Sequence, residues 1–202
     1  MKNNKYKGLL VVISGPSGAG KGTVCREYLR THKDTILSIS VTTRHPRRGE
    51  REGVSYFFRD RATFESMIDN NEFLEYAKVY DNYYGTPKEY VFKHLEQGHD
   101  VILEIDIQGA LQVKKNFPEG VFIFIMPPSM EELKRRIVSR GTETSEAIMK
   151  RFKSAYEEIN YIDQYNYLVV NDKVKNAAAK IEAIITAEKC RVDRNRHLYI
   201  DK

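Results

Sequence analysis

The sequence is poor in cysteine, and its two cysteines form no recognisable pattern. Cys25 and Cys190 lie far apart along the 202-residue chain. Neither has a partner at the spacing of a zinc motif. The five histidines also show no metal-ligand spacing. Because reduced thiols are typical of proteins inside the cell, we expect an intracellular protein without a zinc site.

The sequence also lacks a long apolar run. The apolar stretch at residues 9–13 is too short for a membrane span or a signal peptide, and residues 1–5 before it are polar. No internal repeat is present, and the three alanines at 177–179 are the longest low-complexity segment. We therefore expect a soluble, cytoplasmic protein that does not bind membranes.

Composition and charge set further bounds. The chain is 41% hydrophobic and 30% charged, and its length suits one sizeable core with small inserted lobes. A net charge of +5 is modest. One interpretation of it is nucleic-acid binding. We favour the alternative that arginines gather around bound phosphates, and we expect one domain over residues 1–202 with no nucleic-acid partner.

Apolar runs alternate with helical patterns along most of the chain, which predicts an α/β fold with a mostly parallel sheet. Strands are expected at residues 9–13, 36–41, 56–58, 72–77, 79–80, 100–106, 121–126 and 167–170. Residues 38–86 form a strand-rich insertion whose short turns predict antiparallel pairing. The functional site should lie at the carboxyl ends of the parallel strands.

Three local signals concern the ends of helices. Thr63 is a candidate cap for a short helix through Ile68. Ser129 and Glu132 have the spacing of a capping box, in which each residue bonds the backbone of the other. Residues 191–202 are too charged to be core and are expected to be exposed or frayed.

One stretch combines a buried strand, a glycine-rich loop and a helix, the order that a phosphate-binding loop requires. Its residues are Gly15, Pro16, Ser17, Gly18, Ala19, Gly20, Lys21, Gly22 and Thr23. An ordinary strand-to-helix turn is the alternative, but the spacing of glycines, lysine and threonine disfavours it. The common pattern has Ser or Thr directly after the lysine. Here Gly22 stands there, so Thr23 must supply any hydroxyl directed at Mg²⁺.

Together with five further segments, this loop makes residues 10–173 resemble a guanylate kinase. The further segments are residues 40–50, 71–77, 82–86, 103–109 and 140–144. The resemblance implies a P-loop NTPase-type parallel sheet flanked by helices. It also implies a core of residues 1–37, 91–129 and 158–202, an inserted strand-rich GMP-binding lobe at 38–90, and a helical lid at 130–157.

The resemblance implies reversible, Mg²⁺-dependent phosphoryl transfer from ATP to GMP or dGMP, giving ADP and GDP, in purine nucleotide metabolism. ATP and GMP would be the partners and Mg²⁺ the cofactor. The residues implied for ATP are the nine of the phosphate loop and Arg136. Those implied for catalysis are Lys21, Arg44, Arg140 and Arg151. For Arg136, Arg140 and Arg151 the alternative is that they are solvated residues on the surface of a helix.

The resemblance assigns Arg44, Arg47, Tyr56 and Tyr84 to the GMP phosphate. Guanidinium groups suit a phosphate because they donate two parallel hydrogen bonds; a solvated basic loop is the alternative. The guanine contacts are assigned to Ser40, Glu75, Thr86 and Asp106. A carboxylate accepts from both the N1–H and the N2 amine of guanine, whereas adenine has neither donor there.

Three of the four guanine contacts have another interpretation. Glu75 would be an exposed strand residue, and Thr86 only the helix cap ahead of Pro87. Asp106 would hold magnesium-bound water instead of the base.

Two other functions remain open for a chain with these motifs. A non-catalytic, guanylate kinase-like protein-binding module is disfavoured by the intact phosphate loop. A kinase for another nucleoside monophosphate would suit the Gly22-Thr23 ending, which resembles the adenylate kinase form, but not the motifs of residues 38–90. The sequence predicts nothing about the oligomeric state.

Overall fold

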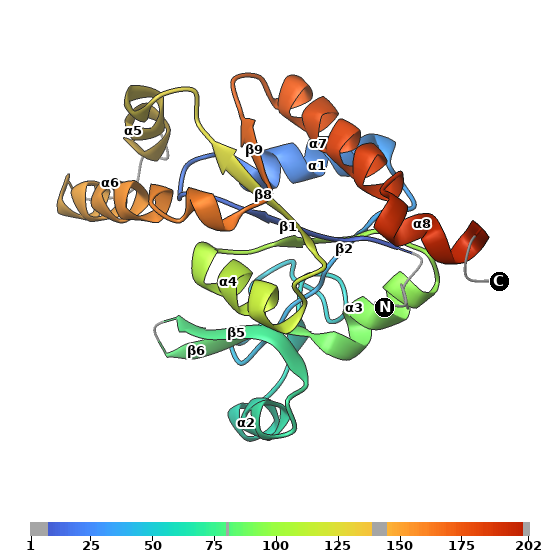
Figure 1. Ribbon diagram of the computed structural model, residues 1–202. Coiled ribbons are helices and arrows are strands. Elements are labelled where there is room, and N and C mark those ends of the chain that lie inside the picture. Colours follow the sequence, from blue (N-terminus) through green and yellow to red (C-terminus); the bar gives the residue numbers. More distant parts are fainter. Residues whose placement is uncertain (1–7, 80, 139–144, 200–202) are drawn as a thin grey trace.

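A five-stranded parallel sheet forms the centre of the computed structural model, which describes residues 8–79, 81–138 and 145–199 (Figure 1). The strand order is β2-β7-β1-β8-β9, and every neighbouring pair is parallel. The strands are β1 (Leu10–Ser14), β2 (Ile36–Leu37), β7 (Val101–Glu104), β8 (Val121–Met126) and β9 (Tyr167–Val170). This confirms the predicted α/β fold with a parallel sheet.

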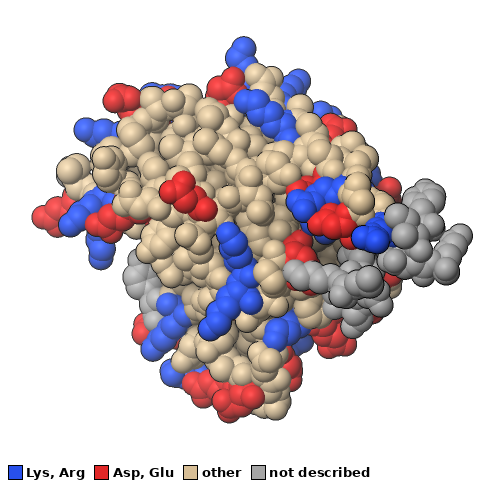
Figure 2. Space-filling view, in the orientation of Figure 1, with Lys and Arg blue, Asp and Glu red and all other residues tan. Residues whose placement is uncertain are grey.

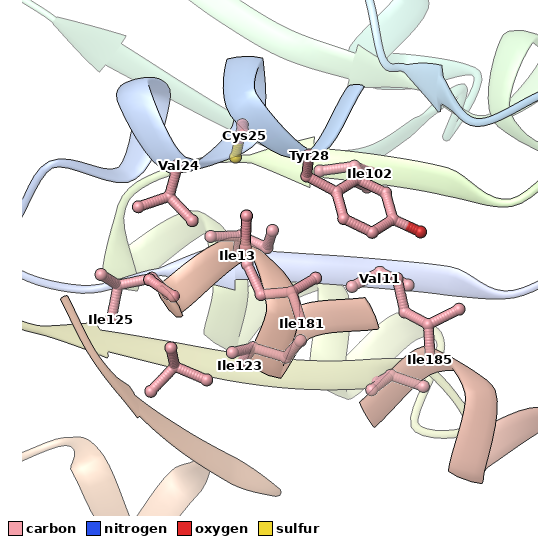
Figure 3. Close-up of a cluster of buried hydrophobic side chains, with 14 of the residues drawn as sticks. Val11, Ile13, Val24, Cys25, Tyr28, Ile102, Ile123, Ile125, Ile181 and Ile185 are labelled. Carbon is pink, nitrogen blue, oxygen red and sulfur yellow. The ribbon is translucent and has the colours of Figure 1, made fainter. Parts of the chain in front are cut away.

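Helices cover both faces of this sheet. α1 (Lys21–Thr31) and α7 (Val174–Lys189) lie on one face, and α3 (Lys88–Glu96) and α4 (Ile107–Asn116) on the other (Figure 1). Val11 and Ile13 of β1 pack toward α1 and α7, as Figure 3 shows. Leu10 and Val12 pack toward α3 and α4. Because both faces are covered, the central strands are apolar almost without interruption.

A second, four-stranded sheet lies beside the core, in the order β4-β3-β6-β5 (Figure 1). Its strands are β3 (Val41–Thr42), β4 (Phe57–Phe58), β5 (Phe73–Val79) and β6 (Asn82–Pro87). β6 pairs antiparallel with β3 and β5, as predicted, but β3 and β4 are parallel. The antiparallel prediction is wrong for this pair because a long loop, not a tight hairpin, joins the two strands.

The single strand predicted at residues 36–41 is also wrong, because two short strands occupy it. β2 belongs to the core sheet and β3 to the second sheet. Ser38 still donates its N–H to Ile102 O of β7 at 2.9 Å, after which the chain leaves the core. Alternating apolar residues suit a strand in either sheet, so the pattern does not show where the chain changes partners.

The segment predicted to be a lid, residues 130–157, falls largely in α5 (Met130–Val138) and α6 (Ser145–Ile159), which pack through buried Leu133, Ile137 and Ala155. The Ser129 hydroxyl accepts from Glu132 N at 3.2 Å, which is one half of the predicted capping box. The Glu132 carboxylate instead pairs with Arg135 and Arg136.

The prediction that Thr63 caps a helix is wrong. Asp60, not Thr63, caps α2 (Arg61–Asp69), because its carboxylate accepts from Thr63 N at 2.7 Å. The negative charge of a carboxylate at this position also interacts favourably with the positive end of the helix dipole.

The C-terminal segment is more ordered than its charge suggests. Residues 192–199 form α8 (Val192–Tyr199), which follows the short 3₁₀ turn η1 (Ile162–Gln164), β9 and α7 along the chain. Glu188 is buried and accepts hydrogen bonds from Arg194 at 3.1 Å and from the Tyr167 hydroxyl. A buried carboxylate needs such partners, and the hydrogen bond from Arg194 holds the first turn of α8 against Glu188. The predicted exposure is confirmed at Val192, which is 76% exposed, but residues 192–199 are not frayed, because they form this helix.

Basic and acidic side chains are mixed over the face shown in Figure 2. Within the described residues, no helix has both the length and the apolar character needed to cross a membrane.

The second sheet depends on a small aromatic core of its own. Phe64 of α2 is fully buried and stacks on Phe73 at 4.5 Å and on Tyr83 at 5.2 Å between ring centroids. We predict that Phe64→Ala lowers the free energy of unfolding by about 3–5 kcal/mol, measured by urea denaturation. Glu65→Ala, on the exposed side of the same helix, should change it by less than about 0.5 kcal/mol. Equal effects of the two changes would contradict this packing.

Candidate functional site

The glycine-rich loop leaves the carboxyl end of β1 and enters α1, beside the ends of β8 and β9. Gly15 has φ +140°, and a Cβ there would lie 2.2 Å from Ile125 O. Gly20 has φ +92°, and a Cβ there would lie 2.5 Å from Asn171 Nδ2. Both the left-handed backbone and the close approach require glycine. The loop backbone therefore packs directly against the ends of β8 and β9.

Lys21 lies in the first turn of α1 and folds back over the loop. Its Nζ donates to Gly15 O at 2.6 Å and to Pro16 O at 3.3 Å. Burial lowers the pKa of Lys21, while the nearby carboxylates of Glu104, Glu158 and Asp106 raise it. The ammonium thus has only backbone carbonyls as direct partners among these contacts, and a phosphate chain would be a stronger one.

The helices α5 and α6 also contact this loop. Arg151 donates to the Ser17 hydroxyl at 2.9 Å, and Glu158 accepts from Ser17 N at 3.2 Å. Residues 151 and 158 lie two turns apart on α6, so they share one face of the helix. Arg136 of α5 donates to Ala19 O at 3.3 Å and to Asn171 O at 3.0 Å.

The predicted Arg140 lies outside the described residues. The other two arginines predicted for the lid, Arg136 and Arg151, both contact the phosphate loop.

The unusual Gly22 has a local reason. A Cβ at this position would lie 3.0 and 3.2 Å from the two carboxylate oxygens of Glu104, at the end of β7. A larger side chain would press against this carboxylate. Thr23 is exposed, and its hydroxyl accepts from Arg26 at 3.3 Å.

A buried carboxylate lies at the edge of the second sheet. Glu75 of β5 is only 8% exposed, and the Thr86 hydroxyl of β6 donates to it at 2.6 Å. Burial raises the pKa of Glu75 to about 7, and the charge of Asp106 adds to this while Thr86 opposes it. Glu75 is therefore not the exposed strand residue of the plainer alternative.

Asp106 lies close to Glu75 and also acts on Lys21 of the phosphate loop. Its carboxylate caps α4 by accepting from Gly109 N at 2.8 Å. A Cβ on Gly109 would lie 3.0 Å from Glu75 Oε2, so the missing side chain leaves room for the two carboxylates to approach each other. Asp106 raises the pKa of both Glu75 and Lys21. The two halves of the site therefore adjoin at this residue.

An open cavity of about 260 Å³ lies between the start of α4 and the second half of α6. Its polar lining includes Asp106, Gln108, Ser154, Glu157 and Glu158. Ser40, the remaining base-contact candidate, holds the second sheet through its carbonyl, which accepts from Phe57 N at 2.9 Å.

Three of the predicted phosphate-binding residues form one cluster in the second sheet. The Arg44 guanidinium lies 5.5 Å from the centre of the Tyr56 ring, and the rings of Tyr56 and Tyr84 are 6.0 Å apart. The Arg47 side chain is exposed, and its backbone N donates to Glu50 at 2.8 Å. The structure thus brings together Arg44, Tyr56 and Tyr84, with Arg47 one turn away along the loop.

Sequence reasoning missed three carboxylates that contact the site residues: Glu50, Glu104 and Glu158. Glu158 had a usable signal, since it follows Arg151 by seven residues, a spacing that places two side chains on one face of a helix. Glu50 and Glu104 stood inside quoted motifs, but nothing in a sequence shows which arginine or glycine a surface carboxylate will meet.

Comparisons with known proteins agree with one another. The family model described as "Guanylate kinase" matches residues 7–188. A guanylate kinase of Caldanaerobacter subterraneus subsp. tengcongensis is 66% identical over 97% of this chain and 95% of its own length. One of Clostridium tetani is 67% identical over 93% and 90%. The crystal structure of guanylate kinase from Anaplasma phagocytophilum superposes with a TM-score of 0.73, at 37% identity over 93% of this chain and 89% of that one.

The raised pKa of Glu75 gives a prediction about stability and pH. The folded protein holds the proton more tightly than the unfolded chain, so stability present below pH 4.5 is lost as the pH rises through about 7. Glu75→Gln should abolish this loss, and should gain roughly 3 kcal/mol on the native protein between pH 4.5 and 8. Urea denaturation at both pH values measures it, with Glu72→Gln at an exposed site as the control. A constant difference between Glu75→Gln and the native protein would refute it.

Proposed function

The chain belongs to the guanylate kinase family, and from this membership we propose how its residues share the work of the reaction. The protein is an enzyme, an ATP:GMP phosphotransferase. The near full-length similarity to bacterial guanylate kinases supports neither a non-catalytic binding module nor a kinase for another nucleoside monophosphate.

The ATP phosphates bind to the phosphate loop in this proposal. The loop amides and the N-terminus of α1 present N–H donors and a positive dipole to an anion. Lys21 exchanges its carbonyl partners for phosphate oxygens. Arg136 and Arg151, already at the loop through Ala19 and Ser17, add charge from the lid. Arg140 is proposed for the same role from family resemblance alone.

Nucleotide kinases generally use ATP as its magnesium complex, and the residues beside Lys21 suit that ion. Mg²⁺ prefers oxygen ligands and keeps several of its waters. The Glu104 carboxylate faces the bare backbone of Gly22, and the Thr23 hydroxyl lies one residue further along α1. We propose that these two residues hold the ion directly or through its waters. When bound, the ion neutralises charge on the ATP phosphates.

The buried Glu75 carboxylate is the observation that carries the assignment of the second substrate. Thr86 is its direct hydrogen-bond donor among the described contacts. The N1–H and N2 amine of guanine supply two more donors, which fit an ionised carboxylate. Adenine would present a lone pair to it, leaving the buried group unpaired. Asp106 and Ser40 complete the base pocket in this proposal.

Arg44, Arg47, Tyr56 and Tyr84 bind the GMP phosphate. A planar guanidinium donates two parallel hydrogen bonds to such a group, and the tyrosine hydroxyls add neutral donors. An oxygen of this phosphate then forms a bond to the γ-phosphorus of ATP, and the bond from that phosphorus to the β-γ bridging oxygen breaks. The cations offset repulsion between the two anions, and the lid keeps water from the transferring group.

A coupled assay of ADP release tests the function, with ATP and each of GMP, dGMP, AMP, CMP, UMP and dTMP. We expect turnover with GMP and dGMP and little with the others. For Glu75→Gln we expect selectivity for GMP over AMP to fall by about 10²-fold or more, toward the range set by an unpaired buried group, while the KM for ATP stays within about twofold.

Two outcomes of this assay would count against the proposal. No turnover with GMP would contradict the enzyme activity. Unchanged selectivity in Glu75→Gln would leave the activity standing and refute the role of Glu75. Glu72→Gln, at an exposed site next to the same strand, serves as the matched control.

A further inference from the structure

We propose that Glu50 is a positioning residue, which fixes Arg44 and the turn of Arg47 in the geometry that receives the phosphate of GMP. This inference rests on the proposed function, because it assumes that Arg44 contacts that phosphate. It adds to the phosphate site an acidic residue that never touches the anion itself.

A single carboxylate bonds both arginine positions. Glu50 Oε1 accepts from Arg44 Nη2 at 2.8 Å, and Oε2 accepts from Arg47 N at 2.8 Å. The backbone N of Glu50 also donates to Arg47 O at 3.0 Å, which closes the turn from the other end. The side chain of one arginine and the backbone of the next are thus tied to each other through Glu50.

Further contacts hold Arg44 in the same place. Its Nη1 donates to His45 O at 2.8 Å, and its backbone N donates to the Thr42 hydroxyl at 3.2 Å. The side chains of Arg44 and Glu50 are only 14% and 21% exposed, so their ion pair is more sheltered than a typical surface pair. The guanidinium is therefore fixed against the Tyr56 ring before any ligand arrives.

The arrangement leaves Arg44 able to bind a phosphate. A guanidinium carries five N–H donors, and the bonds to Glu50 and His45 use two of them. Because the second oxygen of Glu50 goes to Arg47 N, the carboxylate does not take both prongs of the Arg44 fork. Fixing a long side chain in advance removes the rotamer entropy that a ligand would otherwise have to overcome.

Two effects of Glu50 oppose each other, and the inference commits to one of them. Its negative charge repels a phosphate, so removing it would tighten GMP binding if charge dominated. Its two hydrogen bonds preorganise the donors, so removing it weakens GMP binding if positioning dominates. We infer that positioning dominates.

The same loop supplies a matched control. Glu52 also bonds one backbone N–H and one arginine, since it accepts from Phe58 N and from Arg59 Nη1, both at 2.8 Å. These partners lie in and beside β4, and neither is proposed to bind the phosphate, although the Phe58 ring lies 5.9 Å from the Tyr56 ring. Loss of Glu52 therefore reports any general loosening of the second sheet.

The experiment compares Glu50→Ala, Glu50→Gln and Glu52→Ala by calorimetric binding of GMP and by inhibition with guanosine, which lacks the phosphate. For Glu50→Ala we expect the Kd of GMP to rise roughly tenfold, the size expected from one or two side chains that must be ordered on binding. The affinity for guanosine and the KM of ATP should change by less than twofold. Glu50→Gln should have a smaller effect, because it keeps one oxygen acceptor, and Glu52→Ala should leave the GMP affinity unchanged.

Unchanged or tighter GMP binding in Glu50→Ala would overturn the inference, and so would an equal loss for GMP and guanosine. Arg44→Lys separates this failure from that of the proposed site. If Arg44→Lys leaves the ratio of GMP to guanosine affinity unchanged, the phosphate cluster itself is wrong. If that ratio falls for Arg44→Lys but not for Glu50→Ala, only the role of Glu50 is refuted. Melting curves show whether each variant is folded. If Glu50→Ala does not fold, Glu50→Gln takes its place, and unchanged or tighter GMP binding in Glu50→Gln would then overturn the inference.

Discussion

Taking the Glu75 carboxylate out of water costs free energy, and the contacts that the protein itself provides recover this cost only in part. Thr86 donates one hydrogen bond, yet burial still raises the pKa of Glu75 to about 7. The neighbourhood is shaped around this group. Gly109 has no side chain to fill the space, and Asp106 adds a second negative charge nearby. A ligand with two adjacent N–H donors stabilises the ionised carboxylate, and a ligand without them does not. In the proposed function, selectivity for guanine follows from this incompletely hydrogen-bonded carboxylate.

The other half of the site solves a different electrostatic problem, because two phosphorylated substrates must meet. The cationic groups proposed to bind the phosphates come from separate elements: Lys21 from the start of α1, Arg151 from α6 and Arg44 from the loop after β3. Glycines let the phosphate loop approach the ends of β8 and β9 closely enough to be rigid. Asp106, at the start of α4, acts on the pKa of both Glu75 and Lys21. The base pocket and the phosphate loop are therefore coupled through one residue of the core.

Much of the fold could be predicted from sequence, because strands covered on both faces are apolar throughout, as β1 and β8 are. The division of residues 36–41 between two sheets could not, since alternation looks the same in either sheet. The parallel pairing of β3 and β4 depends on the path of a loop that has no apolar period. In the proposed site, motifs named Lys21, Glu75 and Arg44 by number, and their roles stay predictions. They could not give the contacts of Glu50, Glu104 and Glu158, because carboxylates are common on surfaces and their partners are fixed only by tertiary structure.

Proton release on GMP binding tests the central claim most directly. Calorimetry at pH 7, in buffers of different ionisation enthalpy, counts the protons released. If Glu75 has a pKa of about 7 in the empty protein and is ionised against guanine, roughly half a proton should leave per GMP bound. Subtracting the release seen with Glu75→Gln removes the contribution of the phosphate, and the difference should vanish at pH 9. Equal proton release by the native protein and Glu75→Gln at pH 7 would contradict the account.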